Sequence, residues 1–292
     1  MKQDTLPKVL VIFHIFYRDQ IPWFLSKLAH INHCRWDLAV TGPSLQEEDR
    51  QAILAFKPDT RFVATDNVGY DVWPFIQVLQ QTDLSPYAFI VKLHTKGLVD
   101  GYDFRYNHYH IKAMRWRDSL VDALLESDFR WRRVLHIFKH EKNAGMVCSR
   151  KLIILSDTMP EDNELLDEEL AHLGIQCDDR RFCAGTMFAV RPKILEPILR
   201  RGLKKEDFQS DNTSHSGGTL AHVYERVFCL IVRASGYKMR PTGSWLSYYG
   251  LKFYYNYIAP VLLWIFEIDR ENIEGFKDGP KYLRIFGLKF YL

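Results

Sequence analysis

Segments typical of strands alternate with segments typical of helices over the first hundred residues. Residues 8–17 are a run of mainly β-branched and aromatic side chains, as in a strand buried on both faces. Residues 21–31 follow with Pro22 in the first turn and apolar residues at three- and four-residue spacing, which predicts a helix. The order repeats, with predicted strands at 36–41, 61–65 and 87–93 and predicted helices at 44–56, capped by Ser44, and 72–79. This alternation predicts a parallel α/β sheet, in which ligands bind beyond the carboxyl ends of the strands.

The composition is that of an ordinary globular protein. The chain has 292 residues, of which 47% are apolar, and 39 Lys and Arg against 36 Asp and Glu leave a net charge of +3. This excludes a disordered chain, and the five cysteines, which lack zinc spacing, exclude a disulfide scaffold and predict no metal site. So small a charge predicts no nucleic-acid partner. The apolar run Val9–Phe13 is too short for a signal peptide, so we expect a cytoplasmic protein.

The middle of the chain is richer in helix and shows no repeat or linker. The pattern predicts one strand over 182–190, and we expect one domain over 1–240 and an extension over 241–292. Further helices are predicted at 116–125, 131–139, 161–173, 192–200 and 222–234.

Three residues between a predicted strand and a predicted helix are candidates for a ligand site. Asn67 and Gly69 can take backbone conformations closed to most residues, which lets main-chain amides approach a ligand. Asp71 stands near the start of the helix, where its carboxylate either serves such a site or only caps the helix. A helix cap alone stabilises a helix by about 1 kcal/mol. For Asn67 and Gly69 the alternative is a plain turn.

A cationic cluster follows the fourth predicted strand. Lys92, His94, Thr95 and Lys96 lie at the edge of the sheet where ligands bind, directly before Gly97. Lys and His donate to phosphoryl oxygens, and a glycine lets the backbone come close, so the cluster suits a diphosphate. A solvated strand end is the alternative, but a lysine inside an apolar run is hard to leave unpaired.

Two further groups come from the second half of the chain. Gly185 and Thr186 interrupt an apolar strand, which indicates the close approach of a ligand or of another backbone. His222 and Glu225 share one face of a predicted helix, with Arg226 one turn after His222. A carboxylate held near a His and an Arg is a reasonable general base, although a structural ion pair explains the spacing nearly as well.

In this order, the motifs resemble the rhamnan synthesis protein F family. The resemblance covers about residues 8–240 and rests on Asn67-x-Gly69-x-Asp71, Lys92-x-His94-Thr95-Lys96, Gly185-Thr186 with Arg191, and Glu225-Arg226. Members are cell-surface polysaccharide glycosyltransferases, typically assigned as rhamnosyltransferases that use dTDP-L-rhamnose. The resemblance implies an α/β, GT-A-like nucleotide-sugar transferase fold with a mostly parallel central sheet and a C-terminal aromatic helical appendage.

The resemblance also implies roles for the candidate residues. Glu225 would deprotonate the acceptor, with Asp71 as the next catalytic candidate. The donor would be bound by Asn67, Gly69, Lys92, His94, Thr95 and Lys96. The acceptor would be a polysaccharide or a lipid-linked saccharide. The residues that would bind the acceptor and the transferred sugar are Gly185, Thr186, Arg191, His222 and Arg226.

The cluster after the fourth strand departs from the metal-binding pattern of many GT-A enzymes. There an Asp-x-Asp holds a divalent metal on the diphosphate, whereas this chain has His94-Thr95-Lys96. Cationic side chains could offset the leaving-group charge instead, so we expect no obligatory metal, with Mg²⁺ or Mn²⁺ as the alternative. Two other functions stay open: transfer from another nucleotide sugar such as UDP-galactose or UDP-glucose, and a non-catalytic binding or scaffolding role.

The extension beyond Pro241 concentrates the aromatic residues of the chain. Its uncharged run, Phe253–Phe266, has 14 residues and is too short to span a bilayer, which takes about 20. Trp and Tyr side chains beside basic residues suit a membrane surface. That interpretation makes the protein peripheral on the inner face of the cytoplasmic membrane; the alternative is a helical element packed on the domain. The basic residues are Lys252, Lys281, Arg284 and Lys289.

Overall fold

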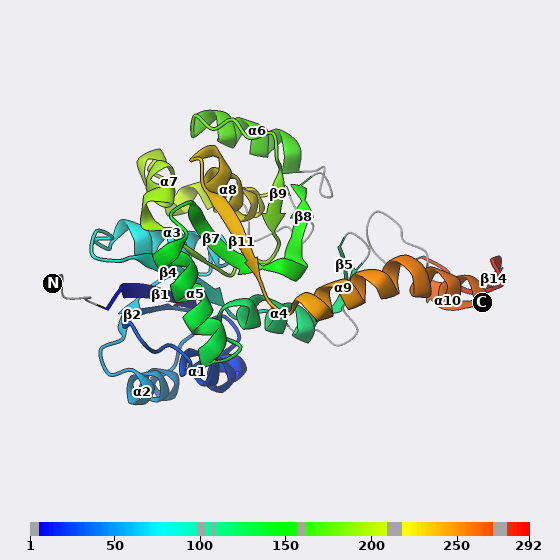
Figure 1. The fold of residues 1–292 in the computed structure, drawn as a ribbon, viewed down its shortest axis with the longest axis horizontal. Coiled ribbons are helices and arrows are strands. Elements are labelled where there is room, and N and C mark those ends of the chain that lie inside the picture. Colours follow the sequence, from blue (N-terminus) through cyan, green and yellow to red (C-terminus); the bar gives the residue numbers. More distant parts are fainter. Residues whose placement is uncertain (1–5, 98–102, 107–108, 157–161, 209–217, 271–278) are drawn as a thin grey trace. The chain divides into compact units, whose positions relative to one another are not determined.

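The chain divides into two compact units. The computed structural model describes residues 6–97, 103–106, 109–156, 162–208, 218–270 and 279–292 (Figure 1). The first unit contains Met1–Asp103 and Lys112–Gly243, and the second contains Phe104–Ile111 and Ser244–Leu292.

A seven-stranded sheet in the order β11-β7-β10-β4-β1-β2-β3 forms the centre of the first unit. β1 pairs in parallel with β2 and β4, and β2 pairs in parallel with β3. β10 runs antiparallel between β4 and β7, and β11 is parallel to β7. The predicted α/β fold with a mostly parallel central sheet is confirmed. The strands are β1 (Lys8–His14), β2 (Arg35–Thr41), β3 (Arg61–Val63), β4 (Phe89–His94), β7 (Ala144–Ser149), β10 (Phe188–Val190) and β11 (Lys238–Thr242).

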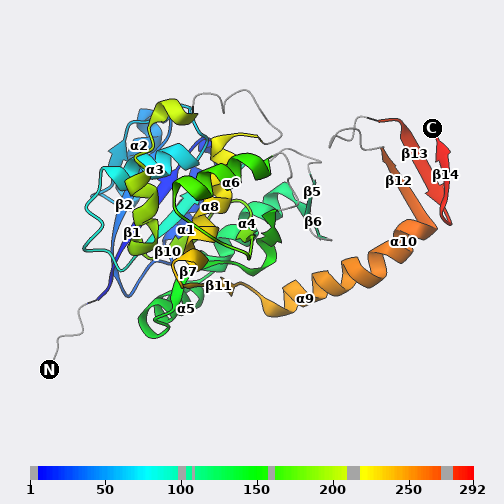
Figure 2. The ribbon, with the colours of Figure 1, turned by 90° about the horizontal axis from the view of Figure 1, so that it is seen from above.

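Helices cover both faces of this sheet because its strands are apolar on both sides (Figure 2). On one face Phe13 contacts Phe24 of α1, and Phe89 stacks on Phe138 of α5 with 4.3 Å between ring centroids. On the other face Phe188 of β10 packs between Phe75 of α3 and Phe228 of α8. The helices of the first unit are α1 (Ile21–Leu28), α2 (Glu47–Phe56), α3 (Val72–Gln80), α4 (Ala113–Leu125), α5 (Asp128–His140), α6 (Asn163–His172), α7 (Glu196–Arg201) and α8 (Leu220–Ala234).

The prediction of one strand over residues 182–190 is wrong. The segment forms β9 (Arg181–Cys183), which pairs with β8 (Ile153–Leu155) in a separate sheet, and then β10. Between them the backbone takes positive φ values, 91° at Gly185 and 49° at Thr186, which no strand accommodates. The interruption turns the chain into the site described below.

The predicted cap of the second helix is also wrong. α2 begins at Glu47 with Gln46 as its N-cap, and the Gln46 amide donates to Asp49 Oδ2 at 2.9 Å. This reciprocal capping box satisfies the first turn without Ser44.

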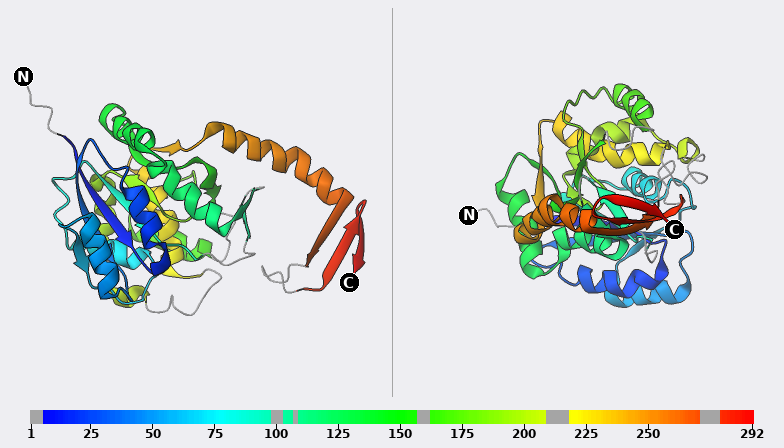
Figure 3. Two further views of the ribbon diagram at one scale, coloured as in Figure 1. Left: turned by 90° about the horizontal axis from the view of Figure 1, so that it is seen from below. Right: turned by 90° about the vertical axis from the view of Figure 1, so that its right-hand side faces the viewer.

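The second unit contains helices followed by strands, whereas the sequence predicted only helix (Figure 3). Trp245–Ile265 is helical throughout, with a π-helical turn at Tyr254–Ile258 between α9 (Trp245–Phe253) and α10 (Ala259–Ile265). A three-stranded antiparallel sheet follows, formed by β12 (Phe266–Arg270), β13 (Lys281–Ile285) and β14 (Leu288–Tyr291). The short pair β5 (Asp103–Tyr106) and β6 (Tyr109–Lys112) precedes α4 in the chain. No helix in the described part of the chain has both the length and the apolar character to cross a bilayer.

Candidate functional site

Polar side chains gather at the carboxyl edge of the central sheet. His14, Thr41 and His94 end three adjacent parallel strands in matched register. All three side chains are buried, and His14 Nδ1 lies 2.9 Å from Thr41 Oγ1. Parallel strands therefore deliver these groups to the edge at which α/β proteins bind ligands.

A buried ion pair anchors the site. Lys92 Nζ donates to Asp71 Oδ2, and the lysine side chain is only 1% exposed. The same ammonium donates to Thr186 Oγ1 at 3.1 Å and to the Thr186 carbonyl at 3.2 Å. The Phe75 and Phe228 rings flank it, with centroids 5.5 and 5.8 Å from Nζ. The Lys92 ammonium is thus buried and held by protein partners.

Asp71 is the member of this pair nearest to solvent. It is the N-cap residue of α3, yet its side chain makes no capping hydrogen bond. It accepts from Lys92 and, at 2.9 Å, from Thr186 Oγ1, so helix capping does not explain this carboxylate. Burial alone would raise the pKa of Asp71, but the charges of His94, Lys92 and Lys96 outweigh it and hold that pKa well below its usual range. Asp71 is therefore a carboxylate at every physiological pH.

His94 joins Asp71 to the turn after β9. Its Nε2 lies 2.9 Å from the Gly185 carbonyl, 3.4 Å from Thr186 Oγ1 and 3.5 Å from Asp71 Oδ2. Its Nδ1 lies 3.0 Å from the carbonyl of Thr95. Burial lowers the pKa of His94 to about 3, while the charge of Asp71 and the hydrogen bond to the Gly185 carbonyl oppose that shift.

Gly185 is required at this turn for space as well as for its conformation. A Cβ at position 185 would stand 2.7 Å from Leu120 Cδ1 and 3.0 Å from Trp116 Nε1, both of α4. The tight turn lets Thr186 reach Asp71 and Lys92.

Lys96 and Glu225 form the second half of the site. Lys96 Nζ lies 3.8 Å from the centroid of the Trp116 ring. Burial lowers the pKa of Lys96, while the charges of Glu225 and Asp71 oppose that shift. Among the described residues, the Glu225 carboxylate has no hydrogen-bonding or ion-pair partner, and the side chain is partly exposed on α8. The charge of Lys96 thus interacts with the carboxylates of both Asp71 and Glu225.

The loop that carries Lys96 is fixed from the β1 side. Thr95 Oγ1 accepts from the backbone amides of Phe16 and Tyr17 at 2.9 and 3.0 Å. The Gln20 side chain donates to the Lys96 carbonyl at 2.6 Å and accepts from the Lys96 amide at 3.3 Å. The hydrogen bonds of Thr95 and Gln20 therefore fix the loop, and Lys96 is the cation that this loop positions.

The segment before Asp71 forms a tight loop beside α8. Gly69 has φ 64°, and a Cβ there would stand 2.8 Å from Trp73 Cβ. Tyr70 follows with φ 50°, and its ring centroid lies 5.6 Å from that of His222. Asn67 is exposed on the same loop. The loop and His222 thus come together as one wall of the site.

Two predicted site residues lie elsewhere. Arg191 follows β10, whose antiparallel course takes it to the amino-end edge of the sheet, where its guanidinium donates to the carbonyls of Ala144 at 2.7 Å and Phe138 at 2.8 Å. Arg226 forms a fully buried ion pair with Asp162 at 2.5 Å. Both arginines are held by structural contacts.

The sequence analysis missed His14, Thr41, Gln20 and Trp116. The signal applied to His94, a polar residue ending a buried strand, is also present at His14 and Thr41. Gln20 and Trp116 carry no such signal, because their contacts depend on how loops and helices converge.

The charges around Asp71 disfavour a divalent metal at its Oδ2 atom. That atom already accepts from Lys92 and Thr186, and the lysine ammonium would repel a cation. Among the residues that the structure describes, no three His, Cys, Asp or Glu side chains cluster as metal ligands.

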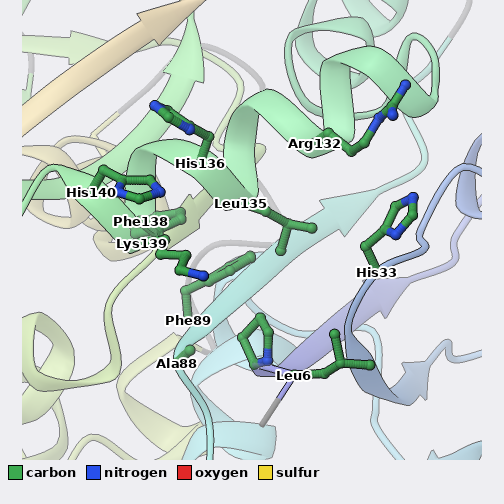
Figure 4. Close-up of a pocket in the computed structure, with 11 residues that line it drawn as sticks. Leu6, His33, Ala88, Phe89, Arg132, Leu135, His136, Phe138, Lys139 and His140 are labelled. Carbon is green, nitrogen blue, oxygen red and sulfur yellow. The ribbon is translucent and has the colours of Figure 1, made fainter. Parts of the chain in front are cut away.

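A cavity of about 470 Å³ opens near the amino ends of β1 and β4 (Figure 4). Arg132, His136 and His140 of α5 line it together with Phe89 and His33. It lies at the strand ends opposite to those that carry His14 and His94. This cavity is therefore separate from the polar cluster at the carboxyl edge.

Replacing Lys92 by Met should destabilise the first unit by about 3–5 kcal/mol, because Asp71 is left buried without its partner. Urea unfolding at neutral pH measures this, and adding Asp71→Asn should restore part of the loss. Lys205→Met is the control, since its ion pair with Asp66 is 39% and 64% exposed and should cost under about 1 kcal/mol. Equal losses for K92M and K205M would contradict the anchoring role.

The stability of the fold should decrease as the pH decreases from about 6.5 to about 4. Burial lowers the pKa of His14 from 6.5 to about 4. Between these pH values the histidine is protonated in the unfolded state and neutral in the folded state, which favours unfolding. By pH 4 the free energy of unfolding is lower by about 3 kcal/mol for this reason. Urea unfolding across this pH range should show a smaller loss for His14→Asn, which cannot titrate, than for the parent chain. Parallel curves would rule out His14 as the source.

Comparison with known proteins places the chain in a family. The family model described as Rhamnan synthesis protein F matches residues 2–237. Two relatives, each named "Uncharacterized protein WxcX", come from two strains of Xanthomonas campestris pv. campestris and are 24% identical over 236 residues. The match covers 80% of this chain and 32% of each relative, so the chain spans about a third of their length.

Among solved structures, the crystal structure of S. aureus TarS 1–349 is similar to this chain, with 10% sequence identity and a TM-score of 0.38. The match covers 78% of this chain and 55% of the TarS chain. A score this low does not establish a common fold. The family match spans six of the seven strands of the central sheet, including β1, β2 and β4 with their carboxyl edge, and ends one residue before β11. The chain belongs to the rhamnan synthesis protein F family.

Proposed function

We propose that the first unit is a glycosyltransferase that moves a sugar from a nucleotide donor to a cell-surface polysaccharide acceptor. Family membership supports this function, and the carboxyl-edge cluster is the observation that carries it. The Lys96 cation and the partly exposed Glu225 carboxylate interact electrostatically at the edge where α/β enzymes bind nucleotides. A strand order with one antiparallel strand between parallel ones agrees with a GT-A-like fold.

The reaction is a direct displacement at the anomeric carbon. An acceptor hydroxyl gives its proton to the Glu225 carboxylate and forms a new carbon–oxygen bond. The bond from that carbon to the diphosphate oxygen breaks, and the nucleoside diphosphate leaves with the electron pair. A β-linked donor then yields an α-glycoside with inversion.

Separate parts of the site serve the donor and the acceptor. Lys96 offsets the charge that develops on the leaving diphosphate, at a place where burial strengthens its field. The Asn67–Asp71 loop receives the nucleoside or the sugar, while Lys92 and His94 hold Asp71 and the Gly185-Thr186 turn in position. The turn and His222 face the acceptor.

The favoured donor is dTDP-L-rhamnose, with UDP-galactose and UDP-glucose as alternatives. A donor panel scored by nucleotide release with a saccharide acceptor separates them. A non-catalytic binding protein with this fold would be stabilised thermally by dTDP or UDP but would release no nucleotide from any donor. No stabilisation and no release would contradict the proposed donor site.

Replacing Glu225 by Gln should reduce kcat by at least about a hundredfold with little change in donor affinity, because it removes only the general base. Glu196→Gln is the matched control, since Glu196 is a 55% exposed glutamate on α7. Circular dichroism and dTDP-dependent thermal stabilisation verify the fold and the donor site. Near-normal turnover of E225Q would remove Glu225 from this role and leave Asp71 as the next candidate.

We propose that the reaction needs no obligatory metal, because cationic side chains occupy the place of a metal-binding motif. Turnover should therefore persist after treatment with a chelator. Loss of turnover that Mg²⁺ or Mn²⁺ restores would overturn this point. Replacing Lys96 by Met should reduce turnover both with and without chelator.

We also propose that the protein works in the cytoplasm at the inner face of the membrane, where a lipid-linked acceptor would be presented. The exposed aromatic residues of the second unit support this location.

A further inference from the structure

The three-stranded sheet of the second unit has one apolar face. Cross-strand partners share a face, and the register sets Ile268 opposite Leu283 and Leu283 opposite Phe290. The neighbouring row sets Phe266 opposite Ile285 and Ile285 opposite Leu288. Two complete rows across three strands are therefore apolar.

The opposite face of this sheet is polar and internally paired. Arg284 forms an ion pair with Glu267 at 2.8 Å. Lys289 Nζ lies 4.1 Å from the ring centroid of Tyr282 and 5.2 Å from that of Tyr291. Side chains alternate along each strand, so these groups point away from the apolar rows.

The last turn of the helix meets the turn between β13 and β14, where the Phe286 and Gly287 amides donate to the carbonyls of Ile265 and Trp264. Arg284 and Lys289 line a pocket together with Leu263 and Trp264 of α10. The apolar face is left open, with Leu288 66%, Ile268 52% and Phe290 50% exposed. Two apolar rows that stay exposed side by side form a patch of the kind that marks a contact surface.

We infer that this face, together with the exposed apolar side chains of α9 and α10, docks on a lipid surface. Lys281 lies on the apolar face, two residues before Leu283 in β13, where a cation can meet lipid phosphate while the apolar rows enter the acyl region. The helices expose Trp245, Tyr257 and Trp264, whose rings suit the membrane interface.

A second copy of the chain is a weaker occupant. Three strands spaced about 4.8 Å apart and about 17 Å long offer a footprint of roughly 250 Å². A stable protein interface takes about 800 Å² from each partner. A lipid surface needs no matched partner and also accepts the helix, where Leu246, Phe253 and Val261 are exposed.

Flotation of the full chain with vesicles tests this docking. The parent should float with phosphatidylcholine vesicles, and more strongly when phosphatidylglycerol is included. Leu288→Asp with Phe290→Asp should reduce the floated fraction by more than about tenfold. The control is Tyr291→Asp, which puts the same charge on the adjacent residue but on the polar face, and it should float like the parent. Lys281→Glu should lose the preference for the anionic lipid and retain binding to the neutral one.

Three results would overturn the inference: a parent chain that stays with the lipid-free fraction, equal flotation of the L288D/F290D and Y291D variants, or a lipid-free dimer that L288D/F290D abolishes. The inference rests on the proposed function only for the purpose of docking, which is access to a lipid-linked acceptor. Nucleotide release with a soluble acceptor, measured on the same preparations, separates failure of docking from failure of the transferase.

Discussion

The buried Lys92–Asp71 ion pair is the interaction on which the site depends. It joins the centre of β4 to the start of α3 and, through Thr186, to the turn between β9 and β10. Two charges removed from water are stable only when their remaining hydrogen-bonding capacity is met, and Thr186 meets it with both its hydroxyl and its carbonyl. The strained Gly185-Thr186 turn follows from this requirement, because an extended strand could not bring Thr186 over the lysine.

This arrangement separates support from chemistry within one cluster of charges. Lys92 and His94 are saturated by protein partners, and Thr95 and Gln20 fix the loop that follows. Lys96 lies over the Trp116 ring, and Glu225 is partly exposed on α8. These two partly exposed residues are the ones that we propose to meet the diphosphate and the acceptor, while the buried groups hold them in place.

The sheet of the second unit leaves one apolar face exposed. Ile268, Leu288 and Phe290 on this face are each at least half exposed. In the first unit, by contrast, helices cover both apolar faces of the sheet. Because removing apolar surface from water is favourable, an exposed apolar face gains from a further contact, and a lipid surface offers one without a matched partner.

The sequence by itself determined the alternating α/β fold, the carboxyl edge as the ligand edge, and the candidates Asp71, Lys92, His94, Lys96, Thr186 and Glu225. Local periodicity and strand-end chemistry carry that information. Only the tertiary structure decided that Lys92 pairs with Asp71, that Arg191 and Arg226 lie in structural contacts, and that the 182–190 segment breaks into two strands. These outcomes depend on contacts between residues far apart in the chain, which local patterns do not record. The apolar face of β12–β14 could not be found from the sequence for the same reason. Strand register, and not composition, decides which side chains share a face.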